Sequence, residues 1–129
     1  MSMLRLLLDE HVSPDVAKGF QRQNGQTPIT SLSHWENGQF LGAPDEVIMV
    51  AAATQKLTLV TYDLRTIPPL LKTWLESGRN HGGVIFVDRN TIAPSDIGGL
   101  VRALVEFAMV PRNEMTNGVF FLKRQSRSP

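Results

Sequence analysis

Short apolar segments alternate with helical patterns along this chain, and this alternation limits the folds that it can adopt. Residues 3–8, 57–61 and 83–87 are predominantly apolar, and each is followed within a few residues by an acid. Apolar strands of this kind are buried on both faces, as in parallel sheets that helices cover on either side. The sequence therefore predicts a three-layer α/β/α sandwich with a mainly parallel central sheet.

The helices of this fold are marked by their starts and ends. Ser13 and Pro14 have the residue types of an N-cap and a first helical position, and Asn24-Gly25 is typical of a helix end. The other elements are predicted in the same way: strands over 27–32 and 119–122, helices from Pro44, near Pro68 and after Pro94, and a long loop over 33–43.

Composition restricts the class of protein. A chain of 129 residues with 42% hydrophobic and 19% charged residues is expected to form one domain, here 1–122, followed by a basic tail at 123–129. The net charge of +1 means that any contact with nucleic acid needs a local basic patch. The lack of cysteine excludes disulfides and thiolate metal sites. No targeting or membrane-spanning pattern is found, so a cytoplasmic protein without membrane contact is expected.

Acidic residues follow the predicted strands. Asp9, Asp63 and Asp88 come after three of them, and Asp45 opens the helix after another. Because the carboxyl ends of parallel strands share one edge of the sheet, these side chains are expected to converge. Carboxylate oxygens are the ligands preferred by Mg²⁺ and Mn²⁺, so the sequence predicts a metal site. The alternative for each single acid is that it caps a loop or a helix start.

Four segments carry a resemblance to a known family. They are LLLDEHVSPDVAKGF (6–20), GAPDEVIMVAA (42–52), LTLVTYD (57–63) and HGGVIFV (81–87). In this order, and over most of residues 4–108, the chain resembles the small PIN-like domain proteins of bacteria and archaea. The resemblance implies a PIN-type nuclease fold and RNA cleavage that depends on Mg²⁺ or Mn²⁺. It also implies the toxin half of a toxin–antitoxin pair, with a small antitoxin partner, and is compatible with a homodimer.

The resemblance also assigns site residues. Asp9, Asp45 and Asp63 match the family's metal-binding and catalytic acids, whereas Tyr62 and Arg65 stand where the family usually has an arginine and a second aspartate. The remaining candidates come from the residues themselves. Glu10, Glu46 and Asp88 are secondary acids, and His11, Arg65 and Trp35 are candidates for substrate contact. Arg65 could hold a phosphate through two hydrogen bonds. Trp35 could stack on an RNA base, or alternatively pack onto the core.

Two other classes of function fit parts of the sequence. A receiver domain of two-component signalling would use the acid pair at Asp9-Glu10, phosphorylation of Asp63 and a lysine at Lys123. Asp88 argues against it, since a serine or threonine is expected at the end of the fourth strand. The other alternative is a PIN-like module that has lost catalysis and binds RNA or a protein partner, which is favoured by Arg65.

Overall fold

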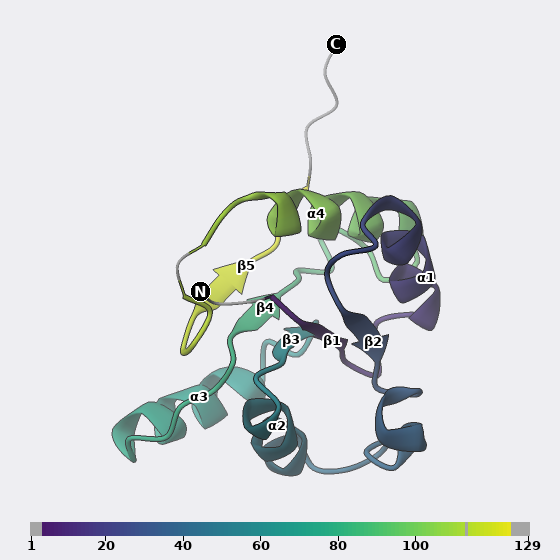
Figure 1. Cartoon of the computed structure of the whole chain (residues 1–129). Helices are drawn as coiled ribbons and strands as arrows, with labels where there is room; N and C mark the ends of the chain where they lie inside the picture. The colour runs from purple at the N-terminus through teal and green to yellow at the C-terminus, as the bar shows by residue number, and fades with distance from the viewer. Residues whose placement is uncertain (1–3, 113, 125–129) are drawn as a thin grey trace.

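The centre of the molecule is a parallel sheet. The computed structural model describes residues 4–112 and 114–124, and within them five strands lie in the order β2-β1-β3-β4-β5 (Figure 1). All four neighbouring pairs are parallel. The strands are β1 (Leu6–Leu8), β2 (Ile29–Ser31), β3 (Thr58–Thr61), β4 (Val84–Phe86) and β5 (Val119–Phe121).

Helices cover the sheet on both faces. They are α1 (Pro14–Gln23), α2 (Asp45–Thr54), α3 (Ile67–Glu76) and α4 (Ile97–Met109), with a short 3-10 helix, η1 (Trp35–Gly38), in the loop after β2. One core lies between the sheet and the pair α1 and α4, and the other between the sheet and the pair α2 and α3 (Figure 1). The predicted three-layer α/β/α architecture with its parallel sheet is confirmed.

The burial of the central strands explains why they appear as apolar segments in the sequence. β1, β3 and β4 are buried at every position, because helices cover both of their faces. β5 lies at the edge of the sheet, and its Val119 and Phe121 side chains remain 50% and 61% exposed. The Phe120 side chain, on the opposite face of β5, packs edge-on against Phe107 of α4 at 5.2 Å between ring centroids.

The starts of α1 and β4 each have an identifiable physical cause. The Ser13 hydroxyl accepts the backbone N–H of Asp15 at 3.2 Å, as expected for an N-cap, and α1 begins at Pro14. Before β4 the chain needs a glycine at position 83, where φ is +105° and a Cβ atom would lie 2.7 Å from the Met115 carbonyl oxygen. This close approach seats the start of β4 against the segment that leads into β5.

The order of the strands determines where a site can form. This order is that of doubly wound sheets whose connections change direction between β1 and β3, and ligands bind outside the carboxyl ends of the strands at such a point. Asp9 directly follows β1, and Asp63 comes two residues after β3. The two acids therefore flank the position in the sheet that is most favourable for a ligand.

The basic tail and the lack of a membrane-spanning segment were also predicted from the sequence. Lys123 and Arg124 begin the predicted basic tail, and residues 125–129 of that tail lie outside the described residues. Among residues 4–112 and 114–124, no helix has the length and apolar character needed to cross a membrane.

Candidate functional site

Asp9 is a buried carboxylate with protein partners for both oxygens. Its backbone N–H donates to the Val60 carbonyl at 2.9 Å, which continues the pairing of β1 with β3. The Oδ2 atom accepts the Thr61 hydroxyl at 2.7 Å, and Oδ1 accepts the backbone N–H of Glu10 at 2.8 Å. The residue is 7% exposed, so these hydrogen bonds offset the cost of taking a carboxylate out of water.

Asp63 shapes the loop between β3 and α3. Its Oδ1 atom accepts the backbone N–H groups of Arg65 and Thr66, both at 2.9 Å. Its own N–H donates to the Thr61 hydroxyl oxygen at 3.0 Å, while that hydroxyl donates to Asp9. Thr61 therefore links the buried carboxylate of Asp9 to the backbone of Asp63, and the two acids are held in one hydrogen-bonded chain.

The hydrogen bonds to Asp63 also control its charge. Burial by itself would raise the pKa of the carboxyl group. Hydrogen bonds from the Thr66 side chain and from the Thr66 and Arg65 backbone outweigh burial and lower the pKa. These hydrogen bonds therefore stabilise the ionised carboxylate of Asp63, which is the state that binds cations.

Asp45 meets Asp63 at a shared hydroxyl group. Asp45 is the first residue of α2, and its Oδ2 atom lies 2.6 Å from the Thr66 hydroxyl oxygen. The same hydroxyl is in contact with Oδ2 of Asp63. Because a hydroxyl group carries one proton, it can donate to only one of these two oxygens at a time. Whichever carboxylate oxygen does not receive this proton faces a lone pair of the Thr66 hydroxyl oxygen. A cation between Asp45 and Asp63 would relieve the resulting repulsion.

Thr61 provides a test of this arrangement. We expect Thr61→Val to lower the free energy of unfolding by about 1.5–3 kcal/mol, because Asp9 loses a donor and the Asp63 N–H loses its acceptor. The matched control is Thr58→Val in the same strand, which removes a hydrogen bond to the uncharged Gly82 carbonyl and should cost about 0.5–1.5 kcal/mol. Urea unfolding measures both values. Equal losses would contradict a special role for the Thr61–Asp9 contact.

A shallow pocket of about 390 Å³ lies beside Asp63. It is lined by His11, Tyr62, Asp63, Leu64, Arg65 and Arg89. His11 and Arg65 were predicted from the sequence, whereas Arg89 was not. The signal for Arg89 was its place directly after Asp88, because the end of the fourth strand was expected at the same edge of the sheet.

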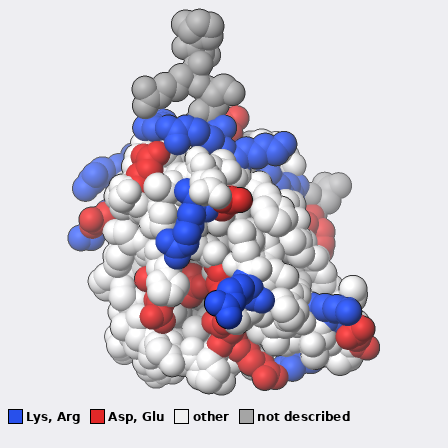
Figure 2. All heavy atoms as spheres, turned by 180° about the vertical axis from the view of Figure 1, so that it is seen from behind, with Lys and Arg blue, Asp and Glu red and all other residues white. Residues whose placement is uncertain are grey.

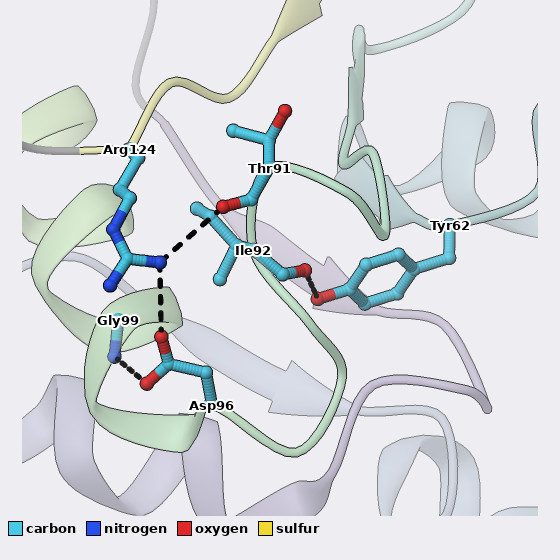
Figure 3. A network of polar contacts seen from close by, with 6 residues as sticks. All are labelled: Tyr62, Thr91, Ile92, Asp96, Gly99 and Arg124. Carbon is cyan, nitrogen blue, oxygen red and sulfur yellow. Dashed lines mark hydrogen bonds and ion pairs between the residues drawn. The ribbon is translucent and has the colours of Figure 1, made fainter.

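Tyr62 connects two of the segments that line this pocket. Its hydroxyl donates to the Ile92 carbonyl at 2.8 Å, and burial raises the pKa of the hydroxyl to about 12 (Figure 3). The guanidinium carbon of Arg89 lies 5.3 Å from the centre of the Tyr62 ring, within the range of cation–π contacts. The loop after β4, which carries Arg89, is therefore attached to the end of β3.

A second set of contacts holds the far end of that loop. The Arg124 guanidinium lies 3.6 Å from the Asp96 carboxylate and 3.5 Å from the Thr91 carbonyl oxygen (Figure 3). The Asp96 carboxylate also accepts the N–H of Gly99 at 2.9 Å at the start of α4. The loop that carries Arg89 is therefore held by Arg124 as well as by Tyr62.

The other predicted acids are not part of this cluster. Glu10 is exposed next to Asp9. Glu46 points to Arg79, with 3.8 Å between the charged atoms, and Asp88 accepts the N–H of Asn90 at 2.8 Å. For Asp88, this hydrogen bond is the loop cap that the sequence left open as the alternative.

Trp35 packs into the core. Its side chain is 6% exposed and stacks on Phe40 at 4.7 Å between ring centroids. Its Nε1–H donates to the Gln55 side chain at 3.3 Å. This is the core-packing alternative for Trp35, and the ring is not available for stacking on an RNA base.

Two of the three predicted metal ligands lie close enough to share a metal ion. Within residues 4–112 and 114–124, no group of three or more His, Cys, Asp or Glu side chains is placed to hold one, so Asp9, Asp45 and Asp63 do not form a single cage. Asp45 and Asp63 do fit Mg²⁺ or Mn²⁺ bound by two carboxylates, since Mg²⁺ commonly takes one or two carboxylates and keeps several waters. The face in Figure 2 shows acidic side chains lying among basic ones.

Comparisons with known proteins leave the family open. No protein-family model, no curated protein and no solved structure matches the chain. The resemblance to PIN-like proteins therefore depends on the four segments of sequence given above.

Proposed function

We propose that this protein is a ribonuclease of PIN-like type that depends on Mg²⁺ or Mn²⁺, with its site where Asp45 and Asp63 meet. The observation that supports this most directly is the Thr66 hydroxyl, which lies between the two carboxylates. The site lies outside the carboxyl ends of the strands, next to the point where the sheet connections change direction. The hydrogen bonds from Thr66 and Arg65 to the Asp63 carboxylate stabilise its charged form and lower its pKa.

Each acid has its own role in this proposal. Asp45 and Asp63 would hold the ion, and water would fill the remaining coordination positions. When bound, such an ion polarises a phosphodiester and acidifies a water molecule. Asp9 is a positioning residue: through the Thr61 hydroxyl it holds the backbone from which the Asp63 side chain projects.

Calorimetric titration with Mn²⁺ tests the proposal. We expect the wild-type protein to bind Mn²⁺, and the double variant Asp45→Asn/Asp63→Asn to lose this binding. The matched control is Asp15→Asn, which removes an exposed carboxylate in the first turn of α1 and should leave Mn²⁺ binding unchanged. Wild-type protein that binds no Mn²⁺ at millimolar concentration and neutral pH would refute the metal site.

The antitoxin partner and the homodimer belong to the same proposal. The antitoxin follows from the resemblance to PIN-like proteins, with which a homodimer is compatible, and neither partner follows from contacts within the chain. Sedimentation of the purified protein tests for a homodimer directly. A purely monomeric protein would refute the homodimer. Relief of growth inhibition by a small protein expressed together with this chain would identify an antitoxin.

A second candidate is a module that binds RNA without cleaving it. It is favoured by the lack of a cluster of three metal-binding side chains among the described residues. RNA binding together with undetectable cleavage in Mn²⁺ would support this candidate over the nuclease. A receiver domain predicts a different product, because acetyl phosphate with Mg²⁺ would then add a phosphoryl group to Asp63.

A further inference from the structure

Two arginines face one pocket beside Asp63. Arg65 comes from the loop between β3 and α3, and Arg89 from the loop after β4. Both residues are exposed, and neither forms an ion pair with a carboxylate in the part of the chain that the structure describes. The pocket is also lined by the Asp63 carboxylate, so the two arginines leave one positive charge in excess, which an anion would neutralise.

Contacts in the two loops position the Arg65 backbone and the Arg89 side chain. The Asp63 carboxylate accepts the Arg65 backbone N–H at 2.9 Å, which fixes where its side chain leaves the loop. Arg89 lies near the Tyr62 ring, whose hydroxyl is fixed by the Ile92 carbonyl. Less conformational entropy is then lost when an anion binds, and affinity rises accordingly.

The remaining walls indicate the kind of anion. A guanidinium group donates two parallel hydrogen bonds to phosphate oxygens, and it tolerates partial burial because it is weakly hydrated. Leu64, which is 43% exposed between Asp63 and Arg65, offers an apolar surface next to the charges. A volume of about 390 Å³ falls within the range of about 300–1,000 Å³ that is typical of ligand pockets. A ligand with both a phosphate and a ring matches this combination, and a nucleotide unit has both.

We propose that Arg65 and Arg89 form a phosphate-binding subsite, which holds one phosphodiester of single-stranded RNA beside Asp63 and does so without a metal ion. The identity of the strand as RNA rests on the proposed function, but binding at this subsite does not require cleavage. The subsite also gives Arg65 a role at the position where PIN-like proteins usually have an aspartate: the acid is exchanged for a cation that contacts the substrate.

The test is binding of a fluorescein-labelled single-stranded RNA of about ten nucleotides, measured by anisotropy in EDTA. We expect Arg65→Gln/Arg89→Gln to weaken binding about tenfold or more, because charge-assisted hydrogen bonds to phosphate are lost. The slope of log affinity against log salt concentration should fall by about 0.7, the value for one phosphate of a single strand. The matched control, Arg22→Gln/Arg102→Gln, changes the charge equally on exposed faces of α1 and α4 and should bind as the wild type does.

Several results would overturn the subsite. It fails if the Arg65/Arg89 variant keeps the wild-type affinity and salt dependence, if the control loses as much affinity, or if the wild type binds no RNA. Displacement of the RNA by polyglutamate of equal charge would show a general anion site instead. Circular dichroism and thermal unfolding of each variant separate loss of binding from loss of fold.

The same assay separates this inference from the proposed function. Asp45→Asn/Asp63→Asn should bind RNA in EDTA at least as tightly as the wild type, because it removes negative charge beside the pocket and leaves both arginines in place. If the wild-type protein shows no Mn²⁺ binding and no cleavage but still binds RNA in EDTA, the proposed nuclease is wrong and the subsite stands. If cleavage is found and the arginine variant binds normally, the nuclease stands and the subsite is wrong.

Discussion

Replacing Asp63 by asparagine is expected to reduce Mn²⁺-dependent RNA cleavage by about 100-fold or more. Residues that only support a metal ligand already contribute about 10–100-fold, and Asp63 is proposed as a ligand itself. The asparagine side chain keeps an oxygen that can accept the Arg65 and Thr66 N–H groups, so the loop should retain its shape. The variant therefore removes the negative charge and keeps the conformation of the loop between β3 and α3. Initial rates on a labelled RNA at matched Mn²⁺ concentration give the change in kcat/KM.

Asp88→Asn is the control for this experiment. Asp88 also follows a strand at the same edge of the sheet, but its carboxylate caps the N–H of Asn90, and asparagine can do the same. We expect this variant to cleave at close to the wild-type rate. Equal losses for the Asp63 and Asp88 variants, or wild-type cleavage by the Asp63 variant, would contradict the role given to Asp63. Unchanged thermal unfolding shows that the comparison is made between folded proteins.

Trp35→Ala is expected to lower the free energy of unfolding by about 3–5 kcal/mol, the usual cost of deleting a large aromatic side chain from a core. Trp35 is the first residue of the 3-10 helix η1; its side chain is buried in the core on the α2 and α3 side of the sheet and stacks on Phe40, and its Nε1–H donates to Gln55. The cavity and the loss of this hydrogen bond act together. Urea unfolding followed by circular dichroism measures the change.

The same variant separates packing from RNA contact. Under conditions where the variant is still folded, its affinity for single-stranded RNA should equal that of the wild type, because the ring is 6% exposed. Leu41→Ala in the same loop is the matched control: Leu41 is 49% exposed, and the substitution should change the free energy of unfolding by less than about 0.5 kcal/mol. Unchanged stability of Trp35→Ala together with weaker RNA binding would show that Trp35 contacts RNA and is not a core residue.

Much of the fold was predictable because the strongest signals were local. Ser13 and Pro14 begin α1 through a hydrogen bond that spans two residues, and the apolar segments at 57–61 and 83–87 contain strands that are buried on both faces. Burial on both faces requires apolar residues at nearly every position, and this is visible in the sequence without knowledge of the neighbouring strands.

The candidate site was predictable only as a region. Asp9 and Asp63 could be placed at one edge because all carboxyl ends of a parallel sheet share it. The Thr66 hydroxyl between Asp45 and Asp63 could not be predicted, because it depends on how the loop after β3 turns toward the start of α2. The position of Arg89 likewise depends on the contact between its loop and Tyr62.

The sequence by itself determined the layers of this protein, the beginnings of its helices and the edge of the sheet that carries its acids. The layers follow from hydrophobic periodicity, and the beginnings of α1 and α4 follow from capping hydrogen bonds between residues close in the chain. The tertiary structure decided that Asp45 meets Asp63, that Arg65 and Arg89 share a pocket, and that Trp35 is buried. Such contacts join residues far apart in the chain. They depend on strand order and on loop packing, which no local pattern of residues specifies.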